Sequence, residues 1–320
     1  MLTQMQQKYL SYLGTFLFSL GLLSLATWTI SRELKNYSYQ DILQSLKALP
    51  SDRLFWSLIL TILCYGVMTG YDTLAMRYIR HPLPYWKTAF AAFTSIAVSN
   101  NIGFALLSGG AIRYRLYRPW QLSKLEIAQV IAFGNLSFWL GMLTVGGILF
   151  ITFPLDVPEL LNFPFASMDL LGGICFALLI GYFIFSILAQ HKTFYWRGSV
   201  FRVPSPQIAT VQITISTIDW AMAAGVLYLL LDIAAVLSYS TFFGIYLLAQ
   251  LARVISNVPA GLGILETVMV LMLAPQIPAD KVLAALLAYR GIYYLLPFVI
   301  ASILLGSYEL LYRRRKRESE

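Results

Sequence analysis

The charged side chains inside long apolar runs of this sequence include Asp219, Arg253, Glu266 and Arg290. A charge at that depth in a bilayer is costly, so each is expected to have a partner or a function. Arginine suits a phosphate because its planar guanidinium binds two oxygens at once. Arg253 and Arg290 could therefore hold an anionic headgroup, or Arg290 could instead pair with Asp219 or Glu266.

Arg253 and Glu266 flank a break in the backbone, Pro-Ala-Gly-Leu-Gly at 259–263. If the chain turns back there, the two side chains face each other across a hairpin. They would form either a headgroup site or switch, or an ion pair that locks the two arms, and the sequence leaves both open. Asp219 could pair with an arginine, relay protons or bind an ammonium group, whereas Asp72, nearer the end of its run, is expected to be structural.

Three further arginines follow the sequence Ser-Gly-Gly-Ala at 108–111. They could capture an anionic headgroup, or they could simply anchor the chain to anionic lipid at the inner leaflet. Polar residues at two predicted turns complete the candidates. The predicted substrate-binding residues are Ser99, Asn100, Asn101, Arg113, Arg115, Arg118, Asp219, Arg253, Ser256, Asn257, Glu266 and Arg290.

The composition defines the class of protein that must position these residues. Of the 320 residues, 58% are hydrophobic and only 12% charged, and the mean hydropathy is +0.70. A soluble domain is about one-quarter charged, and the apolar runs are long enough for helices rather than barrel strands. The sequence therefore predicts an all-α polytopic membrane protein. It contains no nucleotide-binding motif, catalytic set or metal-ligand cluster, so we expect no enzyme activity, no cofactor, no metal and no nucleic-acid partner.

Basic residues predict how the chain crosses the membrane, because cytoplasmic loops carry the excess of Lys and Arg. Both ends of the run at 88–112 are basic, so this run should enter and leave on the cytoplasmic side, turning at Ser-Asn-Asn-Ile-Gly. Counting back from the basic C-terminal tail, the run at 241–274 should enter and leave on the outer side. The apolar runs lie at 10–30, 54–76, 88–112, 126–153, 170–189, 207–231, 241–274 and 282–308.

The result is a single transmembrane domain over 1–320, with six spans, two re-entrant hairpins and cytoplasmic N- and C-termini. Each half, 1–160 and 161–320, contains three crossings and one hairpin, which predicts an inverted repeat typical of secondary transporters. Ser-Asn occurs at both hairpin turns, at 99–100 and 256–257. The two turns would then meet near the middle of the bilayer, facing a shared cavity.

Two stretches resemble a known family. They are SNNIGFALLSGGAIRYRLY at 99–117 and LARVISNVPAGLGILETVMVL at 251–271. Their patterns, S-G-G-A-x-R-x-R and R-x-x-S-x-x-P-x-G-x-G-x-x-E, resemble the membrane region of the lysylphosphatidylglycerol synthase/flippase family, the bacterial multiple peptide resistance factor. The resemblance covers most of the chain.

The resemblance implies a lipid-translocating domain of the bacterial inner membrane. In that family a cytoplasmic transferase loads an amino acid onto phosphatidylglycerol, and the membrane region is thought to move the product outward, which gives resistance to cationic peptides. A chain of 320 residues leaves no room for the transferase, so we expect a stand-alone flippase domain acting on an anionic or aminoacylated phospholipid. The alternative is a non-transporting subunit that docks a separate lipid-modifying enzyme, and either form could be a homo-oligomer.

Overall fold

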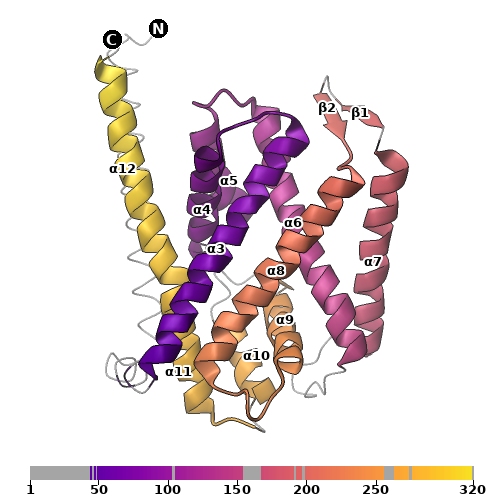
Figure 1. Cartoon of the computed structure of the whole chain (residues 1–320), viewed down its shortest axis with the longest axis vertical. Helices are drawn as coiled ribbons and strands as arrows, with labels where there is room; N and C mark the ends of the chain where they lie inside the picture. Colours follow the sequence, from indigo (N-terminus) through magenta and orange to yellow (C-terminus); the bar gives the residue numbers. More distant parts are fainter. Residues whose placement is uncertain are drawn as a thin grey trace.

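The computed structural model describes residues 44, 47, 49–102, 105–153, 167–190, 192–196, 199–255, 263–273 and 276–318. These residues form a bundle of helices with one small β-hairpin (Figure 1). The elements are α3 (Ser51–Ile79), α4 (Tyr85–Ile102), α5 (Ala105–Tyr117), α6 (Lys124–Thr152), α7 (Met168–Ala189), β1 (Thr193–Trp196), β2 (Ser199–Arg202), α8 (Pro206–Leu231), α9 (Tyr239–Ile255), α10 (Ile264–Leu273), α11 (Ala279–Tyr289), the π-helical segment η3 (Arg290–Leu295) and α12 (Leu296–Glu318).

Five helical stretches of the described chain are long and apolar enough to cross a membrane: α3, α6, α7, α8 and the continuous stretch Ala279–Leu311. The prediction of an all-α polytopic membrane protein is confirmed. The predicted first span at 10–30 lies outside the described residues, so the total of six spans stays a prediction. The antiparallel pair β1–β2, with Thr193 opposite Arg202, lies between α7 and α8.

Local signals in the sequence set where the long helices begin and end. Ser123 begins α6 with a capping box, because its hydroxyl accepts from the Glu126 N–H while the Glu126 carboxylate accepts from the Ser123 N–H. Ser205 caps α8, with Pro206 at the first helical position. Arg80 ends α3 in the left-handed conformation, at φ 58°.

The runs at 88–112 and 241–274 are both broken into two shorter helices, as their polar or glycine-rich middles predicted. In Figure 1, α4 descends from the upper end of the bundle and α5 returns to that end, whereas α9 rises from the lower end and α10 returns to it. Gly263, which precedes α10, has a φ of +80°, a conformation that favours glycine. The chain thus forms two helix hairpins that enter the bundle from opposite ends.

The predicted separation of basic segments matches the two ends of the bundle. The upper end in Figure 1 holds the end of α3, the start of α6, the β-hairpin and the basic tail of α12, and hence Arg80, Lys124 and Arg202. The lower end holds the first turns of α3 and α11, with Arg53 and Lys281. The upper end is therefore the one that the charge pattern predicts to be cytoplasmic.

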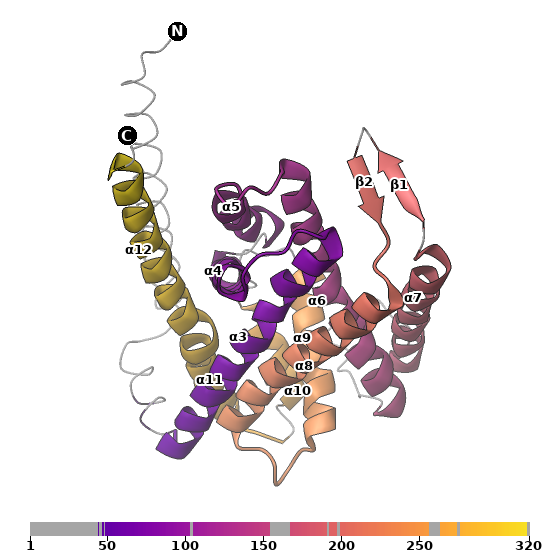
Figure 2. The same cartoon turned by 45° about the horizontal axis from the view of Figure 1, so that its top comes forward.

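Helix α8 packs against both α3 and α6 in the middle of the bundle, while α12 and α7 stand at opposite edges (Figure 2). Its contact with α6 is close because Gly141 has no side chain. A Cβ at Gly141 would lie 2.6 Å from Trp220 Cδ1 and 2.7 Å from the Ser216 carbonyl oxygen. This packing holds the middle of α8, where Asp219 lies, against its neighbours.

Candidate functional site

Glu266 pairs with Arg290, which connects the second hairpin to the last span. Both Nε and Nη2 of Arg290 lie 2.5 Å from Glu266 Oε1. The Glu266 residue is 8% exposed, and its Oε2 is buried with no hydrogen-bond partner among the described contacts. The pairing of Glu266 with Arg253, one of two alternatives that the sequence left open, is not among the described contacts, because Arg290 of η3 binds the carboxylate. The alternative expectation, that Arg290 is a partner of Glu266, is confirmed.

Arg253 instead contacts Tyr294 of η3. Its Nη1 donates to the Tyr294 hydroxyl at 2.9 Å, and its guanidinium carbon lies 5.7 Å from the centre of the same ring. A guanidinium that both donates to a tyrosine and rests on its ring is held in a defined orientation. The π-helical segment therefore positions Arg253 and, through Arg290, Glu266.

The turn of the first hairpin reaches the same tyrosine. The Asn101 side-chain amide donates to the carbonyl oxygen of Tyr294 at 3.0 Å and to that of Ala97 at 2.8 Å. The two hairpins therefore converge on η3, where Asn101 contacts the carbonyl oxygen of Tyr294 and Arg253 contacts its hydroxyl. The sequence predicted that the two turns would face each other, whereas the described contacts run through the last span between them.

Of the four remaining residues predicted at the two turns, the structure describes two, Ser99 and Asn100. Ser99 is buried and its hydroxyl donates to the carbonyl oxygen of Ser95, one turn earlier in α4. Asn100 is half-buried and lies within hydrogen-bonding reach of Tyr65 of α3. Ser256 and Asn257 lie outside the described residues.

Arg113 lies inside the bundle rather than at a membrane surface. It is 7% exposed, and its Nε and Nη2 bind both carboxylate oxygens of Asp72 at 2.8–3.1 Å. The Tyr117 hydroxyl also donates to Asp72 at 2.6 Å. Asp72 has the structural role expected for it. The sequence did not reveal its partner, because Asp72 and Arg113 lie 41 positions apart; the signal was a carboxylate inside one apolar run and an arginine just after the next.

Arg115 of α5 and Arg118, which follows that helix, contact other elements. Arg115 forms an ion pair with Glu309 of α12. Arg118 is exposed and donates to the carbonyl oxygen of Leu122 at 3.1 Å. The three arginines thus do not form one cluster: they contact α3, α12 and the loop before α6, and lipid contact by Arg115 and Arg118 stays a prediction.

Asp219 is buried between α8 and α3 and contacts neutral groups. Its Oδ2 accepts from the Tyr71 hydroxyl at 2.7 Å, and its Oδ1 lies 3.3 Å from the Cys64 thiol. Cys64 is fully buried and forms no disulfide. The sequence offered three roles for Asp219, and one of them was pairing with an arginine. The described contacts of Asp219 include no arginine.

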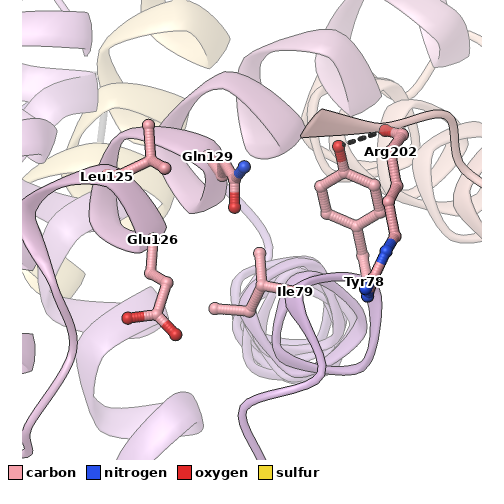
Figure 3. Close-up of a pocket in the computed structure, with 6 residues that line it drawn as sticks. All are labelled: Tyr78, Ile79, Leu125, Glu126, Gln129 and Arg202. Atoms are coloured by element: carbon pink, nitrogen blue, oxygen red, sulfur yellow. Dashed lines mark hydrogen bonds between the residues drawn. The ribbon is translucent and has the colours of Figure 1, made fainter. Parts of the chain in front are cut away.

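A cavity of about 240 Å³ opens at the upper end of the bundle, between α3, α6 and the end of β2 (Figure 3). Tyr78 forms one wall, where its hydroxyl donates to the Arg202 carbonyl oxygen at 2.7 Å, and Gln129 and Glu126 line the opposite side. Glu126 also contacts His81, with Oε1 3.1 Å from Nδ1. Sequence reasoning missed this cavity, since its residues come from three distant segments.

Nothing in the described part of the chain groups three His, Cys, Asp or Glu residues as a metal would need. The buried polar groups instead suit recognition. Arg253, Arg290 and the buried Glu266 Oε2 lie around a π-helical segment, and π-helical turns occur often at functional sites.

Comparison with known proteins identifies the family. The family described as "Lysylphosphatidylglycerol synthase TM region" matches residues 13–301. The chain belongs to this family. The resemblance inferred from the two sequence patterns is thereby confirmed, and with it a membrane protein of a lipid-related family.

Some relatives of this protein match it over most of their own length, whereas others are much longer. The uncharacterized protein slr0712 of Synechocystis sp. is 46% identical over 92% of each chain, and the inner membrane protein YbhN of Escherichia coli is 27% identical over 84% of each. The phosphatidylglycerol lysyltransferase of Staphylococcus haemolyticus is 23% identical over 95% of this chain but only 35% of its own length. The chain therefore spans about a third of the lysyltransferase.

Proposed function

We propose that this protein moves an anionic or aminoacylated phospholipid between the two leaflets of a bacterial inner membrane. The observation that carries the proposal is the convergence of the two helix hairpins on η3, where Asn101 and Arg253 both contact Tyr294. Interrupted helices are tolerated at membrane depth where protein or water satisfies their backbone, and in transporters such interruptions line binding sites.

The chemistry around η3 suits a phospholipid headgroup. Arg253 and Arg290 bring two guanidinium groups to one short segment, and guanidinium binds phosphate in a two-pronged geometry. Glu266 Oε2, buried without a partner, is an acceptor that an ammonium group of an aminoacylated lipid could satisfy. Such a group would bind beside the phosphate while the acyl chains stay in the bilayer.

Family membership supports the same substrate class. A relative over 95% of this chain is a phosphatidylglycerol lysyltransferase, and another is an inner membrane protein. Transport needs no bond making or breaking, so the proposal assigns no catalytic residue. The role in resistance to cationic peptides would follow if the lipid carried to the outer leaflet is aminoacylated.

The proposal includes a topology. The two hairpins, α4–α5 and α9–α10, would be re-entrant from the cytoplasmic and outer sides respectively, and both termini would be cytoplasmic. The halves 1–160 and 161–320 would be inverted repeats within one transmembrane domain. This arrangement places each hairpin so that η3 can be reached from either leaflet as the halves move against each other.

Reconstitution in liposomes tests the proposal. Wild-type protein should transfer a fluorescent phosphatidylglycerol between leaflets faster than empty vesicles, as measured by quenching of outer-leaflet probe. Arg253→Ala and Arg290→Ala should each lower the rate about tenfold or more, because a hydrogen bond to a charged group contributes about 1.5–3 kcal/mol. Arg53→Ala, which removes an arginine paired with Asp232 at the lower end, is the matched control. Wild-type protein that transfers neither phosphatidylglycerol nor its lysyl derivative contradicts the proposal.

A second candidate function is a membrane subunit that docks a separate lipid-modifying enzyme. The observation that favours it is the open cavity at the basic end of the bundle, lined by Arg202, Glu126 and Gln129. Affinity purification separates the two functions. A stoichiometric soluble partner that is lost in Arg202→Ala, with normal lipid distribution in Arg290→Ala, supports docking and contradicts transport.

A further inference from the structure

Asp219 differs from the other buried carboxylates of the described chain. Asp72 and Glu266 each pair with an arginine, whereas Asp219 has no Lys, Arg or His nitrogen within 4.0 Å among the described contacts. It lies in the middle of α8 and is 6% exposed. Burying a charged carboxylate without a cation costs free energy. A carboxylate in this position is therefore a candidate functional group.

The groups that face Asp219 are neutral hydrogen-bonding groups. From α3 come the Tyr71 hydroxyl, the Cys64 thiol and, slightly farther away, Tyr65. From η3 comes the Tyr293 hydroxyl, 3.5 Å from Cys64 Sγ. Tyr71 and Cys64 can donate to a carboxylate, and their oxygen and sulfur atoms can accept from a protonated carboxyl. The same surroundings can therefore hold both protonation states.

Among the described residues, the other helices packed on α8 bring no charged group to this carboxyl. The tyrosines of α9 and α11, Tyr246 and Tyr289, bond to each other at 2.9 Å. Tyr182 of α7 donates to Gln212, about two turns earlier in α8. The Trp220 indole of α8 donates to a carbonyl oxygen of α6. A change in the charge of Asp219 is thus felt mainly by α3 and η3.

Segment η3 connects Asp219 to the proposed lipid site. Tyr293 contacts Cys64 through its hydroxyl, and its carbonyl oxygen accepts from the Tyr65 hydroxyl at 3.1 Å. The next residue, Tyr294, contacts Asn101 and Arg253. One six-residue π-helical segment therefore joins the Asp219 network to the contacts of both hairpins.

We propose that Asp219 is the proton-binding group that couples lipid movement to a transmembrane proton gradient. The proposal rests on the proposed transport function and supplies its energy source. When Asp219 takes up a proton, its carboxyl becomes a donor, and in this proposal its contact with Tyr71 or Cys64 reverses or breaks. This change reaches η3 through Cys64 and Tyr293. Release of the proton toward the other side of the membrane restores the first arrangement.

A gradient experiment tests the coupling with the full chain in liposomes. Transfer of fluorescent phosphatidylglycerol is measured with and without an imposed pH difference. The wild-type rate should change severalfold with the gradient, and that of Asp219→Asn should not. Asp169→Asn, the same change at an exposed carboxylate in the first turn of α7, should behave like wild type. Wild-type transport that ignores the gradient, or an Asp219→Asn variant that still responds, overturns the coupling but leaves the transport function standing.

Infrared difference spectra recorded between mildly acidic and mildly alkaline pH test proton binding without transport. Wild-type protein should gain a protonated-carboxyl band at acidic pH that is missing from Asp219→Asn. If that variant fails to fold, Tyr71→Phe provides the test, since loss of a donor to the carboxylate should shift the midpoint of the band. A band absent from wild type, or a midpoint unmoved in Tyr71→Phe, overturns the proposal even if no lipid is transported.

Discussion

Asp72 and Arg113 form a buried, two-pronged ion pair that ties the returning arm of the first hairpin to α3. Both carboxylate oxygens are engaged, at 2.8–3.1 Å, and Tyr117 supplies a further donor at 2.6 Å. Asp72 is fully buried and Arg113 nearly so. The pair fixes α5 in place, which in turn fixes the hairpin turn that carries Asn101 to η3.

Removal of one partner of this pair should be strongly destabilising. Arg113→Ala leaves the Asp72 charge buried with only Tyr117, and breaking a buried pair costs about 3–5 kcal/mol. We expect a large fall in the thermal unfolding temperature of the purified protein in detergent. The double variant Asp72→Asn/Arg113→Gln, which removes both charges, should be more stable than Arg113→Ala. A single variant as stable as wild type contradicts this role.

Glu266 and Arg290 should be energetically coupled. Each single alanine variant leaves a charge at the proposed site without its partner, whereas the double variant leaves none, so their effects should not add. We expect an interaction free energy of about 0.5–3 kcal/mol from the double-mutant cycle, measured by unfolding in denaturant. The cycle for Arg253 and Glu266, a pair that the described contacts do not contain, should give a smaller interaction free energy.

The sequence predicted the class of fold and the placement of the broken helices well, because those depend on local patterns. Long apolar runs indicate spans, and Pro-Ala-Gly-Leu-Gly indicates an interruption whose last residue does adopt a positive φ. The partners of buried charges depend instead on which helices become neighbours. Arg253 and Glu266 are close in sequence, yet Glu266 pairs with Arg290 because the last span passes beside α10.

The π-helical segment could not be predicted from periodicity. The sequence of Arg290–Leu295 is that of an ordinary apolar helix with one arginine. The wider turn of a π-helix depends on how the chain packs, so the sequence pattern does not indicate it. The contact of both hairpins with Tyr294 could not be predicted from the sequence either, because Asn101 and Tyr294 are 193 residues apart in the chain. The sequence thus indicated most of the polar residues at this site but not the segment that connects them.

Close approach of α6 and α8 should depend on Gly141. A methyl group there would lie 2.7 Å from the backbone oxygen of Ser216, which cannot move as a side-chain end can. Gly141→Ala should therefore cost about 1–3 kcal/mol through overpacking. Gly134→Ala in the same helix is the matched control, because no atom outside its own turn lies within 4 Å of its Cβ position. That variant should be neutral or stabilising by up to about 1 kcal/mol, and equal losses of stability in both would contradict the packing.

Cysteine labelling of intact cells should reveal which side of the membrane each end of the bundle faces. Ser238, before α9, is exposed at the lower end, and Gln121, before α6, is exposed at the upper end. Because the upper end carries the basic segments, a membrane-impermeant maleimide should label Ser238→Cys from outside and should reach Gln121→Cys only after the cells are opened. The background is Cys175→Ala, and Cys64, fully buried, should not react. Labelling of Gln121→Cys but not Ser238→Cys in intact cells would invert the orientation of both hairpins and place the termini outside.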